Sequence, residues 1–186
     1  MGQGPRRAGR RVRIGGVKET TEELDRLQGL LDASIAASGA HLTAIVKPGR
    51  RLSARQLVAD LTGMKVLVVA TVTASGQPRT SAVDGHFLHG HWLFHTSGRA
   101  HKARHLRARP AISATHADGE RMAVFVHGRA ECITPGDAPF DEYDEHFVGH
   151  YGSSPRDWGP TPVFVRIRPT WMVGYAMNAA GFPERP

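Results

Sequence analysis

The run Val66–Thr73 narrows the possible folds more than any other part of the sequence. Its residues, VLVVATVT, are almost all apolar or β-branched. A strand with one face in water alternates polar and apolar residues, whereas a continuous apolar run is typical of a strand covered on both faces. We therefore expect Val66–Thr73 to be a central strand of a sheet or barrel.

Short strand patterns separated by turn signals continue along the chain as far as Ile133. The strand patterns cover residues 79–83, 92–96, 111–116 and 121–133, and the turn signals are Ala74–Pro78, Asp84-Gly85, His89-Gly90 and Asp118-Gly119. A last alternating run at 162–168 is extended by residues 171–175. Strands joined by hairpins at short spacing predict an antiparallel sheet, and their number predicts closure into a small barrel.

Helical patterns flank this region. Thr20-Thr-Glu-Glu23 predicts a capping box, and apolar residues at helical spacing then predict a helix over 21–38. Ser53 repeats the same signal for a shorter helix that ends at Gly63. We expect a short strand or extended link over 41–48, and a helical, acidic segment between Asp137 and Tyr151.

The length of 186 residues fits one domain with an appended arm. We divide the chain into a disordered basic tail (1–18), an N-terminal helical extension (19–50), the barrel domain (51–178) and a loose C-terminus (179–186). Cys132 is the single cysteine, so no intrachain disulfide can form, and a cytoplasmic location is the default expectation. The short apolar runs predict neither a signal peptide nor a membrane span.

The formal net charge of +7 is concentrated in two short segments. Residues 1–18 and 99–109 together hold 11 of the 24 lysines and arginines. The basic tail has no interleaved aromatic residues, so we expect a solvated tail and no nucleic-acid partner.

The second basic segment follows directly on a predicted strand. The strand Trp92–Thr96 breaks at Ser97-Gly98 and leads into a helix that carries Arg99, His101, Lys102, Arg104, His105, Arg107 and Arg109. Free N–H groups at a helix start and fixed positive charge both favour an anion, so this junction is suited to a phosphate; a solvated basic face is the alternative.

Four histidines nearby, His86, His89, His91 and His95, invite a metal interpretation. No cysteine or carboxylate completes a recognised ligand set with them, and the turn at Gly90 separates them. We therefore predict no metal site. Cys132 is interpreted as a small apolar filler.

Several of these features occur together in a known superfamily. They are the strand Val66–Val72, the turn Ser75–Pro78, the strand Arg79–Val83, the run Leu93-Phe-His-Thr96, the basic helix with Lys102, its end at Arg109-Pro110, and the strand Val126-His-Gly-Arg-Ala130. In this order, across about residues 52–176, the sequence resembles the FMN-binding split-barrel superfamily, which comprises pyridoxamine 5′-phosphate oxidase-like proteins and their deazaflavin-dependent relatives. The resemblance implies a mainly β fold with flanking helices, a six-stranded antiparallel split β-barrel.

The resemblance also implies a cofactor site. It makes Lys102, with His101 beside it, the main cation for the cofactor phosphate, and it makes Thr96 and Ser97 hydrogen-bond donors. The residues that it assigns to cofactor binding are Arg79, Thr80, Ser81, His95, Thr96, Ser97, Arg99, His101 and Lys102. Family members are typically homodimers with cofactor sites between subunits. The cofactor itself carries out the hydride chemistry, so no catalytic residue is assigned.

Two departures bear on the choice of cofactor and substrate. His101 stands where true pyridoxamine phosphate oxidases have arginine, and their C-terminal substrate-binding segment is not recognisable, so this substrate is not expected. The surplus of cations resembles the deazaflavin branch, whose coenzyme F420 carries a phosphodiester and a glutamate tail. FMN would need fewer cations, and we leave both cofactors open.

We therefore predict an oxidoreductase that binds F420 or FMN at a dimer interface and transfers hydride to or from a small organic substrate. Two alternatives remain open: a non-catalytic carrier of the cofactor, and a haem-binding or haem-degrading protein, because some split-barrel proteins bind haem. We also expect the helix at 21–38 to cover the partner subunit or the mouth of the pocket.

Overall fold

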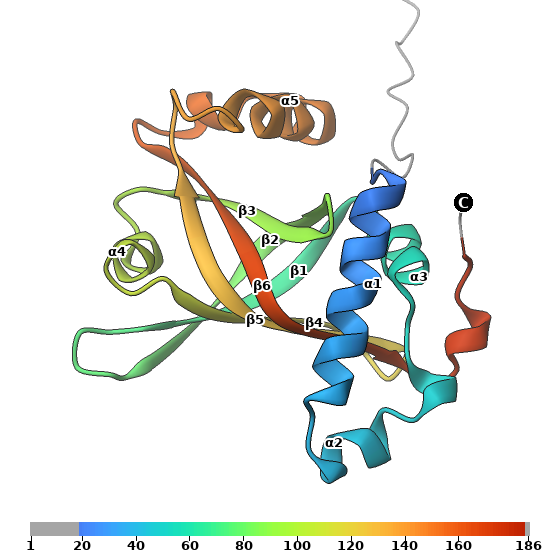
Figure 1. The fold of residues 1–186 in the computed structure, drawn as a ribbon. Helices are drawn as coiled ribbons and strands as arrows, with labels where there is room; N and C mark the ends of the chain where they lie inside the picture. The colour runs from blue at the N-terminus through green and yellow to red at the C-terminus, as the bar shows by residue number, and fades with distance from the viewer. Residues whose placement is uncertain (1–18, 185–186) are drawn as a thin grey trace, which may run out of the picture.

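A computed structural model describes residues 19–184 of the protein as a closed six-stranded antiparallel barrel with flanking helices (Figure 1). The order of strands around the barrel is β1-β2-β3-β6-β5-β4. The strands are β1 (Met64–Val72), β2 (Pro78–Leu88), β3 (His91–Ser97), β4 (Ala111–Asp118), β5 (Met122–Ile133) and β6 (Pro162–Ala176). This confirms the predicted fold class. The predicted basic tail over 1–18 lies outside the described residues.

Helices cover the barrel on three sides (Figure 1). They are α1 (Thr21–Ala36), α2 (Ala40–Ile45), α3 (Ala54–Asp60), α4 (His101–Ala108) and α5 (Phe140–Tyr151), with short 3₁₀ turns η1 (Pro48–Arg50), η2 (Pro155–Trp158) and η3 (Ala179–Gly181). The helices α1 and α3 lie on one side and α4 on the opposite side, next to the projecting hairpin between β1 and β2. The helix α5 lies across the barrel near β3 and β6.

The predicted capping boxes fix the starts of α1 and α3. Thr20 accepts a hydrogen bond from the Glu23 amide (3.2 Å), and Glu23 accepts one from the Thr20 amide (2.8 Å). Ser53 and Gln56 form the same pair of bonds at α3. Each box satisfies two of the amides that have no partner inside a helix, which is why both helices begin where the sequence predicts.

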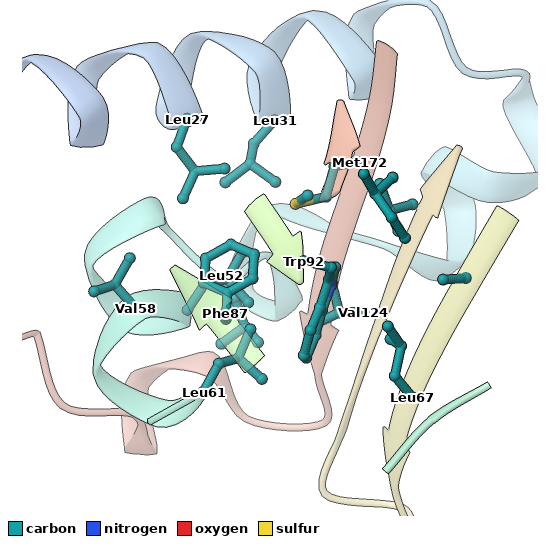
Figure 2. Close-up of a cluster of buried hydrophobic side chains, with 14 of the residues drawn as sticks. Leu27, Leu31, Leu52, Val58, Leu61, Leu67, Phe87, Trp92, Val124 and Met172 are labelled. Atoms are coloured by element: carbon teal, nitrogen blue, oxygen red, sulfur yellow. The ribbon is translucent and has the colours of Figure 1, made fainter. Parts of the chain in front are cut away.

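The main core lies inside the barrel and continues under α1 and α3 (Figure 2). Leu27 and Leu31 of α1 point toward the barrel, where Trp92 and Met172 are completely buried. A smaller second cluster lies between the outer face of the barrel and α5, centred on Phe147. The extension is therefore part of the packed structure rather than a separate arm.

The segment 41–48 differs from the prediction of a strand or extended link. Residues 40–45 form the short helix α2, in which the Val46 amide donates to the Leu42 carbonyl (2.8 Å) and Thr43 Oγ1 donates to the Ala40 carbonyl (3.1 Å). The prediction of a strand or extended link was therefore wrong for residues 41–45. The backbone of this segment forms its hydrogen bonds within the helix, and the chain reaches the edge of β6 only afterwards, at Arg51 and Leu52.

The predicted turn at Asp84-Gly85 is also wrong, because β2 runs through both residues. Gly85 pairs with Lys65 on β1 and with Phe94 on β3. A Cβ atom at Gly85 would lie 2.6 Å from Leu67 Cβ. The glycine therefore permits close packing inside the barrel wall and does not mark a turn.

Residues 179–184, expected to be a loose end, contain the turn η3 and lie beside α3. The Gln56 side-chain amide donates to the carbonyls of Ala179 (2.9 Å) and Phe182 (3.3 Å). Phe182 is 9% exposed. Within residues 19–184, none of the helices combines the length and the apolar character that a membrane crossing needs.

Candidate cofactor site at the start of α4

A tight turn joins the end of β3 to the start of α4. The Gly98 amide donates to the Thr161 carbonyl (2.7 Å), and Arg107 Nη1 donates back to the Gly98 carbonyl (2.8 Å). The Ala100 amide donates to the Ser97 carbonyl (3.0 Å). The turn is held by Thr161, the residue before β6, and by α4 itself, so the first residues of α4 have a fixed orientation.

The first turn of α4 has no side-chain cap in the part of the chain that the structure describes. Its N-cap residue is Ala100, which has no acceptor, whereas α1 and α3 begin with Thr20 and Ser53 in complete capping boxes. The first N–H groups of α4 therefore have no intrahelical acceptor and no capping side chain. They are available to an acceptor from outside the chain.

Positive charge surrounds this uncapped helix start. Arg99 and His101 are exposed, Lys102 is half-buried, and the first turn of α4 contains no acidic residue. The amides of a helix N-terminus together with lysine and arginine side chains favour a phosphate or another anion. This arrangement has the chemistry that the sequence predicted for the junction.

More cations lie along α4 and on the neighbouring hairpin. His105 Nδ1 lies 3.0 Å from Thr71 Oγ1 on β1, which ties α4 to the start of the β1–β2 hairpin. Desolvation lowers the pKa of His105, and so do the positive charges around it, those of Arg109, His101, Arg104 and Arg79. The site therefore carries more positive charge than the first turn of α4 alone.

Arg79, Thr80 and Ser81 lie at the beginning of β2. They pair with Thr71, Ala70 and Val69 of β1, respectively. Directly paired residues share a face of the sheet, so Arg79 leaves the same face as Thr71, whereas Thr80 lies on the opposite face. Arg79 Nη2 donates to Gln77 Oε1 (2.9 Å) at the hairpin tip.

Of the three predicted residues on β3, His95 and Thr96 point in opposite directions, because neighbouring residues of a strand alternate between its faces. Thr96 is 8% exposed and pairs with Val163, a residue of the barrel core. His95 lies on the outer face, with its ring centroid 5.4 Å from that of Trp158 and 5.8 Å from that of Phe164. Burial lowers the pKa of His95, although Asp144 acts in the other direction.

The structure thus brings Ser97, Arg99, His101 and Lys102 together at one turn, with Arg79 close to the same helix. Thr96 lies in the barrel wall next to this turn, and His95 lies apart from it, beneath Trp158. His105 and Arg104 were not among the residues predicted to bind the cofactor. Helical spacing places both on the same face as His101 and was the signal that pointed to them.

A second polar cluster, between β2 and α5, was not predicted. His86 is 1% exposed; its Nε2 lies 3.0 Å from the Tyr151 hydroxyl, and its Nδ1 lies 3.0 Å from His146 Nε2. Tyr151 donates to Asp84 Oδ2 (3.3 Å). Its oxygen therefore accepts from His86 Nε2, and His86 Nδ1 accepts from His146, so a neutral His86 satisfies the whole chain of hydrogen bonds.

The electrostatics of this cluster agree with a neutral His86. Burial and the nearby His146 and His150 lower the pKa of His86 to about 3. Burial and the carboxylate of Asp84 raise the pKa of Tyr151. Among residues 19–184, no group of three or more histidine, cysteine or acidic side chains is placed to hold a metal ion.

The comparisons with known proteins agree with this fold. The sequence profile of the family described as pyridoxamine 5′-phosphate oxidase matches residues 53–174, from the N-cap of α3 into β6. The chain belongs to the pyridoxamine 5′-phosphate oxidase family. The matched range includes the β3–α4 turn and all nine residues that the sequence analysis assigned to the cofactor. No curated protein matches the chain.

Solved structures with the same fold come from several bacteria. A conserved hypothetical protein from Mycobacterium tuberculosis is 19% identical with a TM-score of 0.59, over 75% of this chain and 94% of that one. An FAD-binding protein from Mesorhizobium loti is 23% identical with a TM-score of 0.54, over 68% and 94%. General Stress Protein 26 from Bacillus anthracis is 14% identical with a TM-score of 0.53, over 66% and 92%. At these identities the likeness shows the fold.

Proposed function

We propose that this protein is a cytoplasmic oxidoreductase that binds F420 or FMN by its phosphate at the start of α4. The observation that carries the proposal is the uncapped first turn of α4 among Arg99, His101 and Lys102. The helices α2 and α5 also begin without a side-chain cap, but neither has a lysine or arginine in its first turn, and that of α5 carries two acidic residues. A cofactor phosphate would supply the missing acceptors and the opposite charge.

The residues present fit a phosphorylated cofactor. The Ser97 hydroxyl, the first amides of α4 and the Lys102 ammonium are all donors, which an anion requires. The additional charges of Arg79 and Arg104 near His105 favour F420, whose phosphodiester and glutamate tail carry more negative charge than the single phosphate of FMN. The FAD-binding protein from Mesorhizobium loti has the same fold, which supports a flavin-type ligand.

The role of the protein is to hold and orient the cofactor. When bound, the flavin or deazaflavin supplies hydride transfer to or from a small organic substrate. The turn at Gly98, held by Thr161 and by α4, keeps the phosphate-binding amides in place. No side chain of this protein is assigned as an acid, base or nucleophile.

We further propose that the active form is a homodimer with cofactor sites between subunits. A strip of exposed apolar side chains on the outer face of the barrel supports this proposal. Val66 of β1 is 57% exposed, and Met64, Val68 and Phe125 are also exposed. Val68 and Phe125 both pair with Thr115 of β4, so they lie on one face. An apolar strip of this kind on a soluble barrel is suited to a second copy of the chain.

A parallel fluorescence titration with F420 and with FMN tests the cofactor assignment. We expect tight binding of one of them, weakened about 10- to 100-fold by Lys102→Ala, because a hydrogen bond to a charged group contributes about 1.5–3 kcal/mol. Lys47→Ala is the matched control, because Lys47 is exposed and has no capping contact. Its affinity should equal that of the wild type.

Other outcomes distinguish the alternative functions. Binding without turnover of the reduced cofactor against a panel of acceptors would indicate a carrier. If neither cofactor binds and haem produces a Soret band, the phosphate assignment at α4 is wrong and the haem-binding alternative takes its place.

A further inference from the structure

The hairpin turn between β2 and β3 contains a histidine in a conformation that histidine rarely adopts. Leu88 pairs with His91, which leaves His89 and Gly90 as a two-residue turn with φ angles of 53° and 73°. Such turns favour Asn-Gly, because both residues need a positive φ. Within residues 19–184, His89 is the one residue other than glycine with a positive φ. The turn geometry alone therefore does not explain why a histidine occupies position 89.

The ring of His89 joins two helices that are far apart in the sequence. Its Nδ1 lies 3.1 Å from Glu23 Oε1 in the first turn of α1, and its Nε2 lies 2.8 Å from Glu142 Oε1 in the first turn of α5. The other oxygen of Glu23 accepts from the Thr20 amide. One imidazole ring thus connects the N-terminal extension, the barrel and α5.

This geometry requires a charged ring. An ionised carboxylate only accepts hydrogen bonds, and a neutral imidazole has a single N–H. With a carboxylate at each nitrogen, only the imidazolium form donates at both positions. Burial acts to lower the pKa of His89, but hydrogen bonds and charge from Glu23 and Glu142 outweigh it and raise that pKa. Burial also acts to raise the pKa of Glu23, and contacts with Thr20 and His89 reverse this and lower it.

The other groups around His89 do not compete for its protons. On β3, His91 Nδ1 contacts the His89 backbone carbonyl (2.6 Å) and not its ring. On α1 and α5, Glu23 and Glu142 are the charged groups that act on the ring. The protonation of His89 is therefore governed by these two carboxylates.

We infer that His89 is a proton-operated latch that holds the first turn of α1 and the first turn of α5 on the β2–β3 hairpin. A neutral ring has one N–H, on either nitrogen, so it cannot donate to Glu23 and Glu142 together, and both contacts are weakened. This inference is independent of the proposed cofactor function. Because the pKa of His89 is raised in the folded protein, the stabilisation is complete below about pH 6.5 and disappears as the pH rises through the folded value.

The opening should be local. Further along α1, Leu27 and Leu31 are buried in the main core. Ser34 accepts a hydrogen bond from the Met172 amide (2.9 Å) and, through its carbonyl, one from Trp171 Nε1 (3.2 Å). None of these contacts depends on pH near neutrality. Deprotonation of His89 therefore loosens the attachment of the first turn of α1 to the hairpin, while the capping box and Leu24 keep their contacts and the rest of the helix stays in place.

Amide hydrogen exchange in the first turns of α1 tests the latch. The amides of Leu24, Asp25 and Arg26 are compared between wild type and His89→Asn, a variant that suits the positive φ but cannot carry charge. At pH 6, we expect wild-type protection to exceed that of the variant by about three- to tenfold, a range consistent with a partly exposed ion pair. At pH 8.5 the ratio should approach one. A ratio that is the same at both pH values would overturn the proposal.

A second measurement can be made on the wild type alone. NMR titration of the wild-type histidines should show His89 titrating above 6.5, and Glu142→Gln should lower that value. His41→Asn, a substitution of an exposed histidine on α2, is the matched control for the exchange experiment and should leave α1 protection unchanged. A wild-type His89 that titrates at or below 6.5 would refute the latch.

Discussion

Acidification from pH 7 to pH 4 should destabilise this protein strongly through one residue, His86. Its ring is 1% exposed, and both of its nitrogens are bound in a chain of hydrogen bonds that requires the neutral form. Burial, together with His146 and His150, lowers the pKa of His86 to about 3 in the folded protein. In the unfolded chain a histidine titrates near 6.5.

The sign and the size of the effect follow from this difference. As the pH falls below about 6.5, the unfolded chain takes up a proton at His86 that the folded protein excludes, so stability is lost from there down to about pH 3. Over this range, each pH unit lowers the free energy of unfolding by about 1.36 kcal/mol. At pH 4 the loss is therefore about 3 kcal/mol, a large share of the roughly 5–15 kcal/mol by which a domain is stable.

Urea unfolding followed by tryptophan fluorescence measures this loss, because Trp92 is fully buried in the core. The wild type is compared with His86→Gln, which cannot ionise, and with His41→Gln, which alters an exposed histidine. The free energy of unfolding of the wild type should fall by about 3 kcal/mol more than that of His86→Gln between pH 7 and pH 4. If the wild type and His86→Gln lose the same free energy of unfolding between pH 7 and pH 4, to within about 0.5 kcal/mol, the neutral buried His86 is refuted.

Two further substitutions test the dimer and the barrel wall. Val66→Glu places a charge on the most exposed part of the apolar strip. If the proposed homodimer forms through this strip, light scattering should show a dimer for the wild type and a folded monomer for the variant; equal masses for the two proteins would exclude this surface from an interface. Gly85→Ala sets a Cβ atom 2.6 Å from Leu67 Cβ and should cost about 1–3 kcal/mol or more in urea unfolding. Gly29→Ala is the matched control, because its Cβ meets nothing within 4 Å; in a helix it should gain up to about 1 kcal/mol.

The fold could be predicted from the sequence because its main signals are local. The apolar run at Val66–Val72, the hairpin turn at His89-Gly90 and the capping boxes at Thr20 and Ser53 each fix one element through its own residues. The predictions of secondary structure were wrong where contacts with another element determine the conformation. The pair Asp84-Gly85 is typical of a turn, but Gly85 lies within β2 and allows close packing against Leu67, which lies on another strand.

In the candidate site, too, the local features could be predicted from the sequence and the contacts between distant segments could not. The clustering of Ser97, Arg99, His101 and Lys102 follows from their closeness in the sequence at a strand-to-helix junction. The opposite directions of His95 and Thr96 follow from the alternation of a strand and could have been predicted, whereas the packing of His95 against Trp158 of η2 depends on a segment about 60 residues further along the chain. The roles of His86 and His89 depend on contacts with α5 and α1, more than 50 residues away, so no motif could have predicted them.

The most direct test of a phosphate-binding α4 is the affinity for each cofactor with and without its phosphate. FMN is compared with riboflavin, and F420 with the deazaflavin that lacks the phosphate-bearing tail, for the wild type and Lys102→Ala. We predict that loss of the phosphate weakens wild-type binding of the preferred cofactor about 100-fold, and that Lys102→Ala reduces this discrimination by about tenfold or more. Equal affinity of the wild type for the phosphorylated and unphosphorylated forms would contradict the account.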